Sequence, residues 1–231
     1  MKITWLGHAG FRIEIADQVL LIDPWMTGNP VFPEGRRSDA IAGATQILLT
    51  HGHGDHAGDA LGVARETGAG ITCGHELATL WGGEEGVQIT GMGKGGTVTL
   101  GGVTATMVHA THSSSVDFTG DGLQYAGGES GFVIAGEGRV IYISGDTDVM
   151  ADMKIFHDLH APDIGILACG GHYTMDMRRA AYAAKTFFDF KVVIPCHYGT
   201  FPLLAQSAEP LREALPGVDV RVPAVMEVVE L

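Results

Sequence analysis

The chain is poor in cysteine, with only three such residues, Cys73, Cys169 and Cys196. An odd and widely spaced set of cysteines argues against a disulfide framework and indicates reduced thiols. Cys196 precedes a histidine, but in an extended backbone neighbouring side chains point to opposite faces. We therefore expect Cys196 to be a buried structural thiol and not a metal ligand.

Basic residues are also scarce. The chain has 14 Lys and Arg against 27 Asp and Glu, which gives a formal net charge of −13. Broad attraction to a phosphate backbone needs a basic face, so this balance argues against a nucleic-acid substrate. Divalent ions bound in a cleft would nevertheless make that cleft locally positive.

Long apolar runs are missing. No uninterrupted apolar stretch approaches the ~18 residues that suggest a membrane span. The start, Met1-Lys2-Ile3, enters a strand-like run at once instead of a basic leader followed by an apolar core. We expect a soluble, cytoplasmic protein without a membrane span, and the sequence leaves open whether it is a monomer or a homo-oligomer.

Linkers, low-complexity blocks and tandem repeats are absent as well, and 45% of the 231 residues are hydrophobic. This length and composition fit one domain, residues 1–231, with a substantial core. Strands are predicted near 2–6, 11–15, 19–22, 47–50, 71–73, 87–89, 97–100, 103–109, 131–135, 139–143, 164–167, 192–194, 219–221 and 225–230. Helices are predicted near 57–67, 75–81, 148–158, 175–189 and 203–214, with Thr174 as the cap of the fourth. Strands followed by alternating helices and strands fit a layered α/β sandwich.

The most informative segment is Thr50-His51-Gly52-His53-Gly54-Asp55-His56, directly after the apolar run 47–49. Four good metal ligands so close together are hard to explain as packing. If the apolar run is a strand, His51 and His53 project to the same side, and Asp55 and His56 follow at a turn where a helix can begin. One short segment can then serve two adjacent metal positions.

This segment resembles the metal-binding signature of the metallo-β-lactamase superfamily, H-x-H-x-D-H. The superfamily pattern also requires a His, an Asp and a second His, in that order, each just after a strand. His112 follows the run 103–108, Asp146 follows 140–143, and His197 follows 192–194. All seven expected positions are therefore filled, and the resemblance spans nearly the whole chain.

Flanking segments resemble one branch of that superfamily, the metal-dependent hydrolases similar to ascorbate-6-phosphate lactonase-like proteins. The matching segments are Ile3-Thr4-Trp5-Leu6-Gly7-His8-Ala9-Gly10-Phe11, Leu20-Leu21-Ile22-Asp23-Pro24-Trp25, Gly170-Gly171-His172-Tyr173-Thr174-Met175 and Cys196-His197-Tyr198-Gly199-Thr200-Phe201-Pro202. The resemblance implies a four-layer αββα sandwich with the metals at one edge of the two sheets.

The resemblance also implies a ligand set for two divalent metal ions. One metal would be held by His51, His53 and His112, the second by Asp55, His56 and His197, and Asp146 would bridge them. Imidazole and carboxylate ligands without thiolate suit Zn best here and also allow Mn, Fe, Co or Ni. A bridging hydroxide would attack an ester, lactone, thioester or phosphoester centre.

Several further residues are candidates for roles around the metals. Asp23 is expected to accept an N–H from a liganding histidine, with a turn-forming role before Pro24 as its alternative. Asp55 counts as catalytic as well as ligating. His8 is a candidate to contact substrate or to support a metal ligand, and His172 is a candidate substrate contact or proton donor to the leaving group. A structural turn and a helix entry are the respective alternatives.

Other side chains are predicted to have lesser roles. Tyr198 either donates its hydroxyl to substrate or packs beneath the loop. His109 lies on the face of its strand opposite His112 and is expected to pack or to support a ligand. Residues 26–35 are expected to form a substrate-side flap with Trp25 and Phe32 as apolar walls, or an ordinary surface loop.

The predicted function is that of a metal-dependent hydrolase of a small ester, lactone or phosphoester. The enzymatic alternative is a phosphodiesterase that acts on phospholipid or RNA. An alternative of another class is a non-catalytic metal-binding protein on the same fold, although such proteins usually lose ligands and all seven are present here. The sequence does not identify the substrate.

Overall fold

Two seven-stranded mixed sheets form the centre of the computed structural model, which describes all 231 residues. The first sheet has the spatial order β16 (Val228–Glu230), β1 (Lys2–Gly7), β2 (Gly10–Ile15), β3 (Gln18–Ile22), β4 (Gln46–Leu48), β5 (Gly70–Gly74) and β6 (Ile89–Met92). The second has the order β15 (Asp219–Val220), β14 (Val192–Cys196), β13 (Ile164–Ala168), β12 (Arg139–Ile143), β11 (Ser130–Gly136), β8 (Val103–His109) and β7 (Thr97–Leu100). A separate hairpin pairs β9 (Ser115–Val116) with β10 (Gln124–Tyr125).

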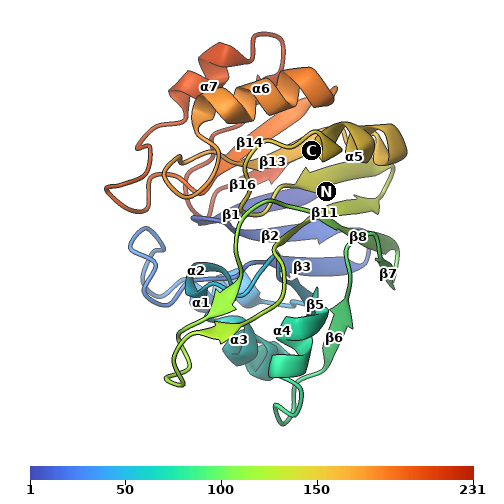
Figure 1. Ribbon diagram of the computed structural model, residues 1–231, viewed down its shortest axis with the longest axis vertical. Coiled ribbons are helices and arrows are strands. Elements are labelled where there is room, and N and C mark those ends of the chain that lie inside the picture. The colour runs from blue at the N-terminus through green and yellow to red at the C-terminus, as the bar shows by residue number, and fades with distance from the viewer.

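The helices cover the two outer faces of this pair of sheets (Figure 1). One side carries α1 (Arg37–Ile41), α2 (Gly54–Ala57), α3 (Ala60–Thr67) and α4 (His75–Leu80), and the other carries α5 (Asp152–His160), α6 (Met177–Phe187) and α7 (Glu209–Ala214). The predicted four-layer αββα sandwich is thus confirmed. None of these helices has the length and apolar character needed to cross a membrane.

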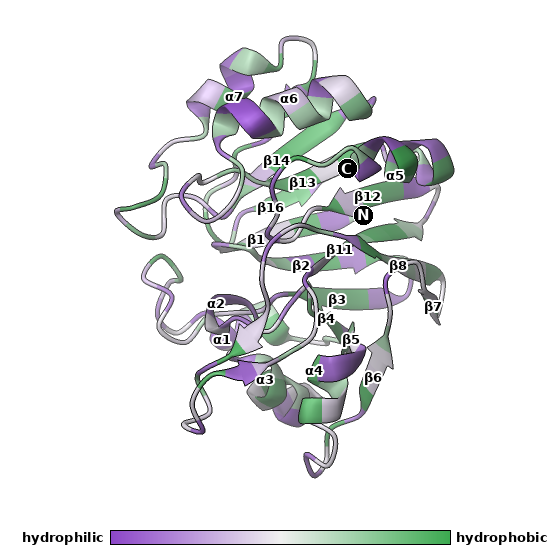
Figure 2. Ribbon diagram, in the orientation of Figure 1, coloured by the Kyte–Doolittle hydropathy of each residue, from purple (hydrophilic) through white to green (hydrophobic).

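The strand period of two distributes apolar side chains between the layers. In β2, Phe11, Ile13 and Ile15 belong to the cluster of 43 buried residues that includes the space between the sheets. In and after β4, Leu48 joins that cluster, whereas Ile47 and Leu49 belong to a second cluster of 19 residues beneath α2–α4. In Figure 2 hydrophobic residues occupy much of the central strands, and the outer helices carry both hydrophilic and hydrophobic residues.

Several strands end at the same edge of the sandwich. In the first sheet β3 and β4 are parallel, and β1 runs in the same direction because β2 is antiparallel to both β1 and β3. In the second sheet β12, β13 and β14 are parallel, and β8 runs the same way because β11 is antiparallel to both β8 and β12. The His197 amide donates to the His8 carbonyl oxygen at 2.9 Å and joins the two sheets at this edge. Every predicted metal ligand therefore follows a strand that ends here.

The helices differ from the sequence prediction at several points, and α5 begins at Asp152 instead of 148. The segment 57–67 is two helices, α2 and α3, and α2 already begins at Gly54 within the histidine motif. The segment 203–214 is helical only in α7, because the preceding loop bonds elsewhere: the Ala205 amide donates to the Gly170 carbonyl oxygen. Thr174 is not the cap of α6; Asp176 is, and its carboxylate accepts from the Arg179 amide at 2.7 Å.

The three cysteines are free thiols and are buried. Burial raises the pKa of Cys73 and of Cys169 to about 12, and raises that of Cys196 well above its ordinary value. Because the thiolate is the reactive form, we expect no thiol of the native protein to react with Ellman's reagent at pH 8 within an hour. All three should react after unfolding in guanidinium chloride. Rapid reaction of a native thiol would show that a cysteine lies nearer the surface than described.

Candidate metal centre

The histidine motif turns from β4 into α2. After β4 ends at Leu48, the chain passes through His51, reaches His53 in an extended conformation at the N-cap, and enters α2 at Gly54. Asp55 and His56 both lie within α2, which is a short helix of four residues. His51 and His56 are almost completely buried, whereas His53 and Asp55 are half-buried. The motif therefore presents two sides, one inside the sandwich and one toward solvent.

One group of possible ligands is made of three imidazoles. His51, His53 and His112 each place a ring nitrogen within 4.8 Å of the others. His51 Nε2 lies 3.0 Å from His53 Nδ1, and the His112 ring centroid is 5.3 Å and 5.2 Å from those of His51 and His53. This is the set predicted for the first metal.

The second group is made of Asp55, His56 and His197, together with His8. Their ligand atoms also lie within 4.8 Å of one another. The rings of His56 and His197 are stacked, with centroids 5.8 Å apart. This group contains the set predicted for the second metal and adds one histidine to it.

Asp146 lies between the two groups. Its Oδ2 is 2.9 Å from His197 Nε2, 3.4 Å from His56 Nε2 and 3.6 Å from His112 Nε2. Asp146 also forms a third group of mutually close ligand atoms with His51 and His56, and so connects the first two. All seven residues predicted as ligands thus meet in one continuous cluster.

The donor atoms of this cluster suit a cation. Buried His56 Nε2, Asp146 Oδ1 and His197 Nδ1 have no hydrogen-bond partner, although buried polar atoms rarely lack one. Burial by itself raises the pKa of Asp146, but the imidazoles of His197 and His56 outweigh burial and hold it well below its usual range. Burial and the neighbouring His56 lower the pKa of His51 well below its ordinary value. An ionised carboxylate and a neutral imidazole are the forms that bind metal.

Asp23 holds one of these imidazoles in place. It follows β3, and its Oδ2 lies 2.8 Å from His56 Nδ1. The same carboxylate accepts from the Thr50 amide at 2.8 Å and from the Thr50 hydroxyl at 2.7 Å. His56 Nδ1 is therefore occupied, which leaves Nε2 facing Asp146. This arrangement is the one expected of a carboxylate that fixes the tautomer of a metal-binding histidine.

His8 is fixed between two partners. It is fully buried after β1, its Nε2 lies 3.0 Å from Asp55 Oδ2, and its Nδ1 lies 2.9 Å from Thr200 Oγ1. Burial lowers the pKa of His8 to about 4, despite the hydrogen bond with Asp55. A neutral ring beside an ionised carboxylate donates from Nε2 and accepts the Thr200 hydroxyl at Nδ1. His8 thus orients Asp55.

The cluster opens into a cavity of about 360 Å³. Its wall consists of His53, Gly54, Asp55, His112, Ser113, Asp117, Asp146, Tyr173 and His197. The sequence prediction did not include Ser113, Asp117 or Tyr173. A signal existed for Ser113, which directly follows His112, and for Tyr173, which directly follows His172, but not for Asp117, which follows the two-residue strand β9. The wall is concave, polar and next to the cluster, as expected of a reaction site.

Three comparisons bear on this geometry. A profile described as "Beta-lactamase superfamily domain" matches residues 2–197. The chain is 68% identical, over the full length of both chains, to a "UPF0173 metal-dependent hydrolase" of Dinoroseobacter shibae. It is 61% identical, again over both full lengths, to a protein of the same description from Paracoccus denitrificans.

A solved structure has the same fold. The metallo hydrolase Igni18 from the archaeon Ignicoccus hospitalis superposes with a TM-score of 0.84 at 33% identity, over 99% of this chain and 97% of that chain. The chain belongs to the metallo-β-lactamase superfamily. Within it, the chain belongs with the UPF0173 metal-dependent hydrolases, as the flanking segments indicated.

In this superfamily member some predicted residues lie apart from the cluster. His172 is exposed and does not line the cavity, while its neighbour Tyr173 does. Tyr198 is buried and stacks on Trp5 at 5.3 Å, so it packs beneath the loop, and burial raises its pKa to about 12. His109 contacts Lys94, with 3.1 Å between Nδ1 and Nζ, outside the cluster.

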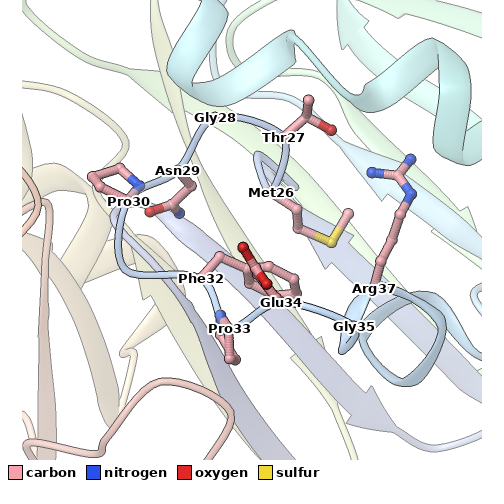
Figure 3. Close-up of a pocket in the computed structure, with 10 residues that line it drawn as sticks. All are labelled: Met26, Thr27, Gly28, Asn29, Pro30, Phe32, Pro33, Glu34, Gly35 and Arg37. Carbon is pink, nitrogen blue, oxygen red and sulfur yellow. The ribbon is translucent and has the colours of Figure 1, made fainter.

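A larger cavity of about 430 Å³ lies under the loop after β3 and contains no residue of the cluster. Figure 3 shows its wall, which includes Met26, Phe32, Glu34 and Arg37. The expected apolar walls of a flap are therefore separated: Phe32 faces this cavity, whereas the Trp25 ring lies 5.4 Å from that of His8. The smaller cavity, and not this one, is lined by the possible metal ligands.

Asp59, just before α3, anchors this loop. Its carboxylate accepts from the amides of Met26 and Thr27 and from the Thr27 hydroxyl, each at 2.7 Å, and it lies 2.8 Å from Arg37 Nη1. Burial by itself raises the pKa of Asp59, but the bonds from Thr27, Met26 and Arg37 outweigh burial and lower it. The ionised form is therefore favoured in the folded protein.

We expect Asp59→Asn to lower the free energy of unfolding at pH 7 by about 3 kcal/mol, because it leaves buried donors poorly matched and breaks a partly buried ion pair. The pKa of Asp59 is lower in the folded protein than its unfolded value of 3.8. The stabilisation is therefore fully present at pH values above 3.8 and is lost as the pH falls through the folded-state pKa. Urea titrations of both proteins from pH 7 to pH 3 should show the difference shrinking toward acid. Asp39→Asn, at an exposed position on α1, is the control.

Proposed function

We propose that the protein is a dinuclear metal-dependent hydrolase whose ligands are the seven residues of the cluster. His51, His53 and His112 would hold one divalent ion, Asp55, His56 and His197 the other, and Asp146 would bridge the two. The observation that supports this proposal best is the position of Asp146, whose Oδ2 lies within 3.6 Å of imidazoles from both sets. Two ligand groups joined by one carboxylate are typical of two-metal hydrolytic sites.

Bound divalent ions lower the pKa of a coordinated water to about 7 and polarise a substrate oxygen. Other residues of the chain orient the ligands. Asp23 holds His56 through Nδ1, and His8 holds Asp55, so two ligands of the second set are oriented before any ion or substrate arrives. No serine or cysteine nucleophile is needed, in agreement with the burial of all three thiols.

Proton transfer to the leaving group needs a donor that reaches the cavity. His172 remains our candidate from the sequence, and Tyr173 beside it lines the cavity, with the two rings 4.4 Å apart. The backbone of His172 has a φ of 52°, an uncommon conformation for a residue with a Cβ, which is often found at functional loops. Loss of turnover in His172→Ala at unchanged metal content would support the assignment, and unchanged turnover would end it.

Zinc is the proposed native metal. The seven ligands supply nitrogen and oxygen donors and no thiolate, which suits Zn and also permits Mn, Fe, Co or Ni. The substrate proposed from this chemistry is a small ester, lactone or phosphoester. We propose a cytoplasmic location and a single domain over residues 1–231, as expected from the sequence.

The proposal is tested by turnover of metal-quantified protein on phosphodiesters, carboxylic esters, lactones, thioesters and β-lactams. Metal near two equivalents, loss of turnover after chelation, and recovery with Zn or Mn are the expected results. Stoichiometric metal without turnover on any of these bonds would instead support the non-catalytic metal-binding alternative. Failure to take up metal would contradict both.

The phosphodiesterase alternative has less support. A net charge of −13 and a cavity wall without Lys or Arg offer little to a nucleic-acid backbone. Preferential cleavage of a phosphodiester in the same panel would nevertheless establish it.

A further inference from the structure

The cavity beside the metal centre carries only negative side-chain charge. Its wall contains three carboxylates, those of Asp55, Asp117 and Asp146, and neither Lys nor Arg. Two of these carboxylates belong to the proposed ligand set and would be neutralised by bound cations, but Asp117 does not. Sites for phosphoester dianions usually add Arg or Lys to any metal, because these side chains pair with the remaining phosphate oxygens.

Basic residues on segments that flank the cavity are engaged elsewhere. Lys94 Nζ lies 3.1 Å from His109 Nδ1 and 3.9 Å from the Glu129 carboxylate. Arg179 Nε lies 3.5 Å from Asp148 Oδ1. Neither side chain lines the cavity. The cavity wall thus offers no Lys or Arg to a phosphate and carries one carboxylate, that of Asp117, outside the proposed ligand set.

Apolar side chains are exposed on the hairpin β9–β10 beside the cavity. Phe118, Leu123 and Tyr125 are 38%, 76% and 74% exposed. Asp117, which lines the cavity, directly precedes Phe118, and Tyr173 on the cavity wall is 54% exposed. Large exposed apolar side chains beside a polar reaction site indicate a surface that binds the apolar part of a ligand.

The base of this hairpin is fastened to the histidine motif. The Gly52 amide donates to Ser114 Oγ at 3.1 Å, and Val116 and Ala126 are buried in the cluster beneath α2–α4. Phe118 lies against the motif itself, since its Cδ1 would be 3.3 Å from a Cβ added at Gly54. The aromatic ring is therefore held next to the ligands His53 and Asp55.

Resting on the hydrolase function proposed above, we propose that the substrate is an uncharged acyl compound, an ester, thioester or lactone, with an apolar group. That group would lie against Phe118 and Tyr173, and Asp117 would disfavour phosphoester dianions. In the reaction, the oxygen of water forms the new bond to the acyl carbon and the bond to the leaving alcohol or thiol breaks. One proton of the water goes to the leaving group and the other to solvent, which leaves a carboxylate.

Binding to metal-free protein tests the apolar contact without catalysis. Five-membered lactams resist hydrolysis far better than the matching lactones, and a series with alkyl chains of two to eight carbons can be titrated by saturation-transfer NMR. Affinity should rise by about fourfold for each methylene buried, and Phe118→Ala should remove most of that rise. Leu159→Ala, at a position 72% exposed on α5, is the control and should bind as wild type does. Equal affinity across the series, or an unchanged rise in Phe118→Ala, would overturn the proposal.

Turnover tests whether the cavity disfavours negatively charged substrates. Nitrophenyl hexanoate, nitrophenyl acetate and nitrophenyl phosphate share a leaving group, and the metal-loaded protein should prefer them in that order. Asp117→Asn should tighten inhibition by phenyl phosphate by about tenfold, whereas Asp121→Asn on the same hairpin should leave it unchanged.

The outcomes separate the two proposals. Preference for the phosphate ester would overturn the acyl-substrate inference and leave the hydrolase function standing. No turnover of any ester, with chain-length-dependent lactam binding that Phe118→Ala removes, would overturn the hydrolase function and leave the apolar subsite standing.

Discussion

Replacement of Asp146 by asparagine is expected to lower kcat/KM for any hydrolysed bond by at least ~10³-fold, because charge stabilisation by metals contributes several kcal/mol to the transition state. Asp146 is 2% exposed and its Oδ2 lies within 3.6 Å of three imidazoles. Asparagine keeps the size of the side chain but removes the charge that joins the two ligand sets. We expect the variant to retain at most one equivalent of Zn after dialysis.

The matched control is Asp148→Asn, the same substitution two residues later in the same loop. The Asp148 side chain is 49% exposed and faces Arg179. This variant should retain two equivalents of metal and wild-type turnover. Full turnover and two equivalents of metal in Asp146→Asn would contradict the assignment of Asp146 as the bridging ligand.

Replacement of Asp23 by asparagine is expected to weaken Zn binding by about 10- to 100-fold, the usual effect of removing a carboxylate that orients a liganding histidine. The reason is local: Asp23 accepts from His56 Nδ1 and from both the amide and the hydroxyl of Thr50. The amide group of asparagine cannot accept at both of its terminal atoms. Asparagine also tolerates the φ of 43° at this position, so the substitution adds no backbone strain that could itself change the Zn affinity.

Competition with a chromogenic chelator measures this affinity directly. Asp39→Asn, exposed on α1, is the control and should match wild type. If Asp23→Asn binds Zn within twofold of wild type, His56 does not depend on Asp23, and the turn-forming alternative before Pro24 explains that residue instead.

The histidine motif and the family pattern together named the seven residues that the structure brings into one cluster. His51, His53, Asp55 and His56 are contiguous, and the other three each follow a strand whose apolar run is easy to recognise. Strands of one direction end at one edge of a sheet, so residues just after them meet in space. The layered fold followed from the same apolar runs, while its four layers came from the family resemblance.

Prediction failed where tertiary contacts decide the local structure. The strands of the hairpin β9–β10 have two residues each, and nothing periodic marks them; they exist because Val116 and Ala126 pack beneath the motif. Asp117 was missed for that reason. Likewise, the loop before α7 resembles a helix in sequence, but Ala205 bonds to Gly170 from another loop.

The proposed centre holds two ions side by side in one cluster of seven residues. The Zn K-edge X-ray absorption spectrum of protein loaded with two equivalents of Zn tests it most directly. We expect imidazole scattering, nitrogen and oxygen in the inner shell without sulfur, and a metal–metal distance of ~3.5–4 Å. Sulfur ligands, or two equivalents of Zn with no metal–metal scattering, would contradict a dinuclear centre at Asp146.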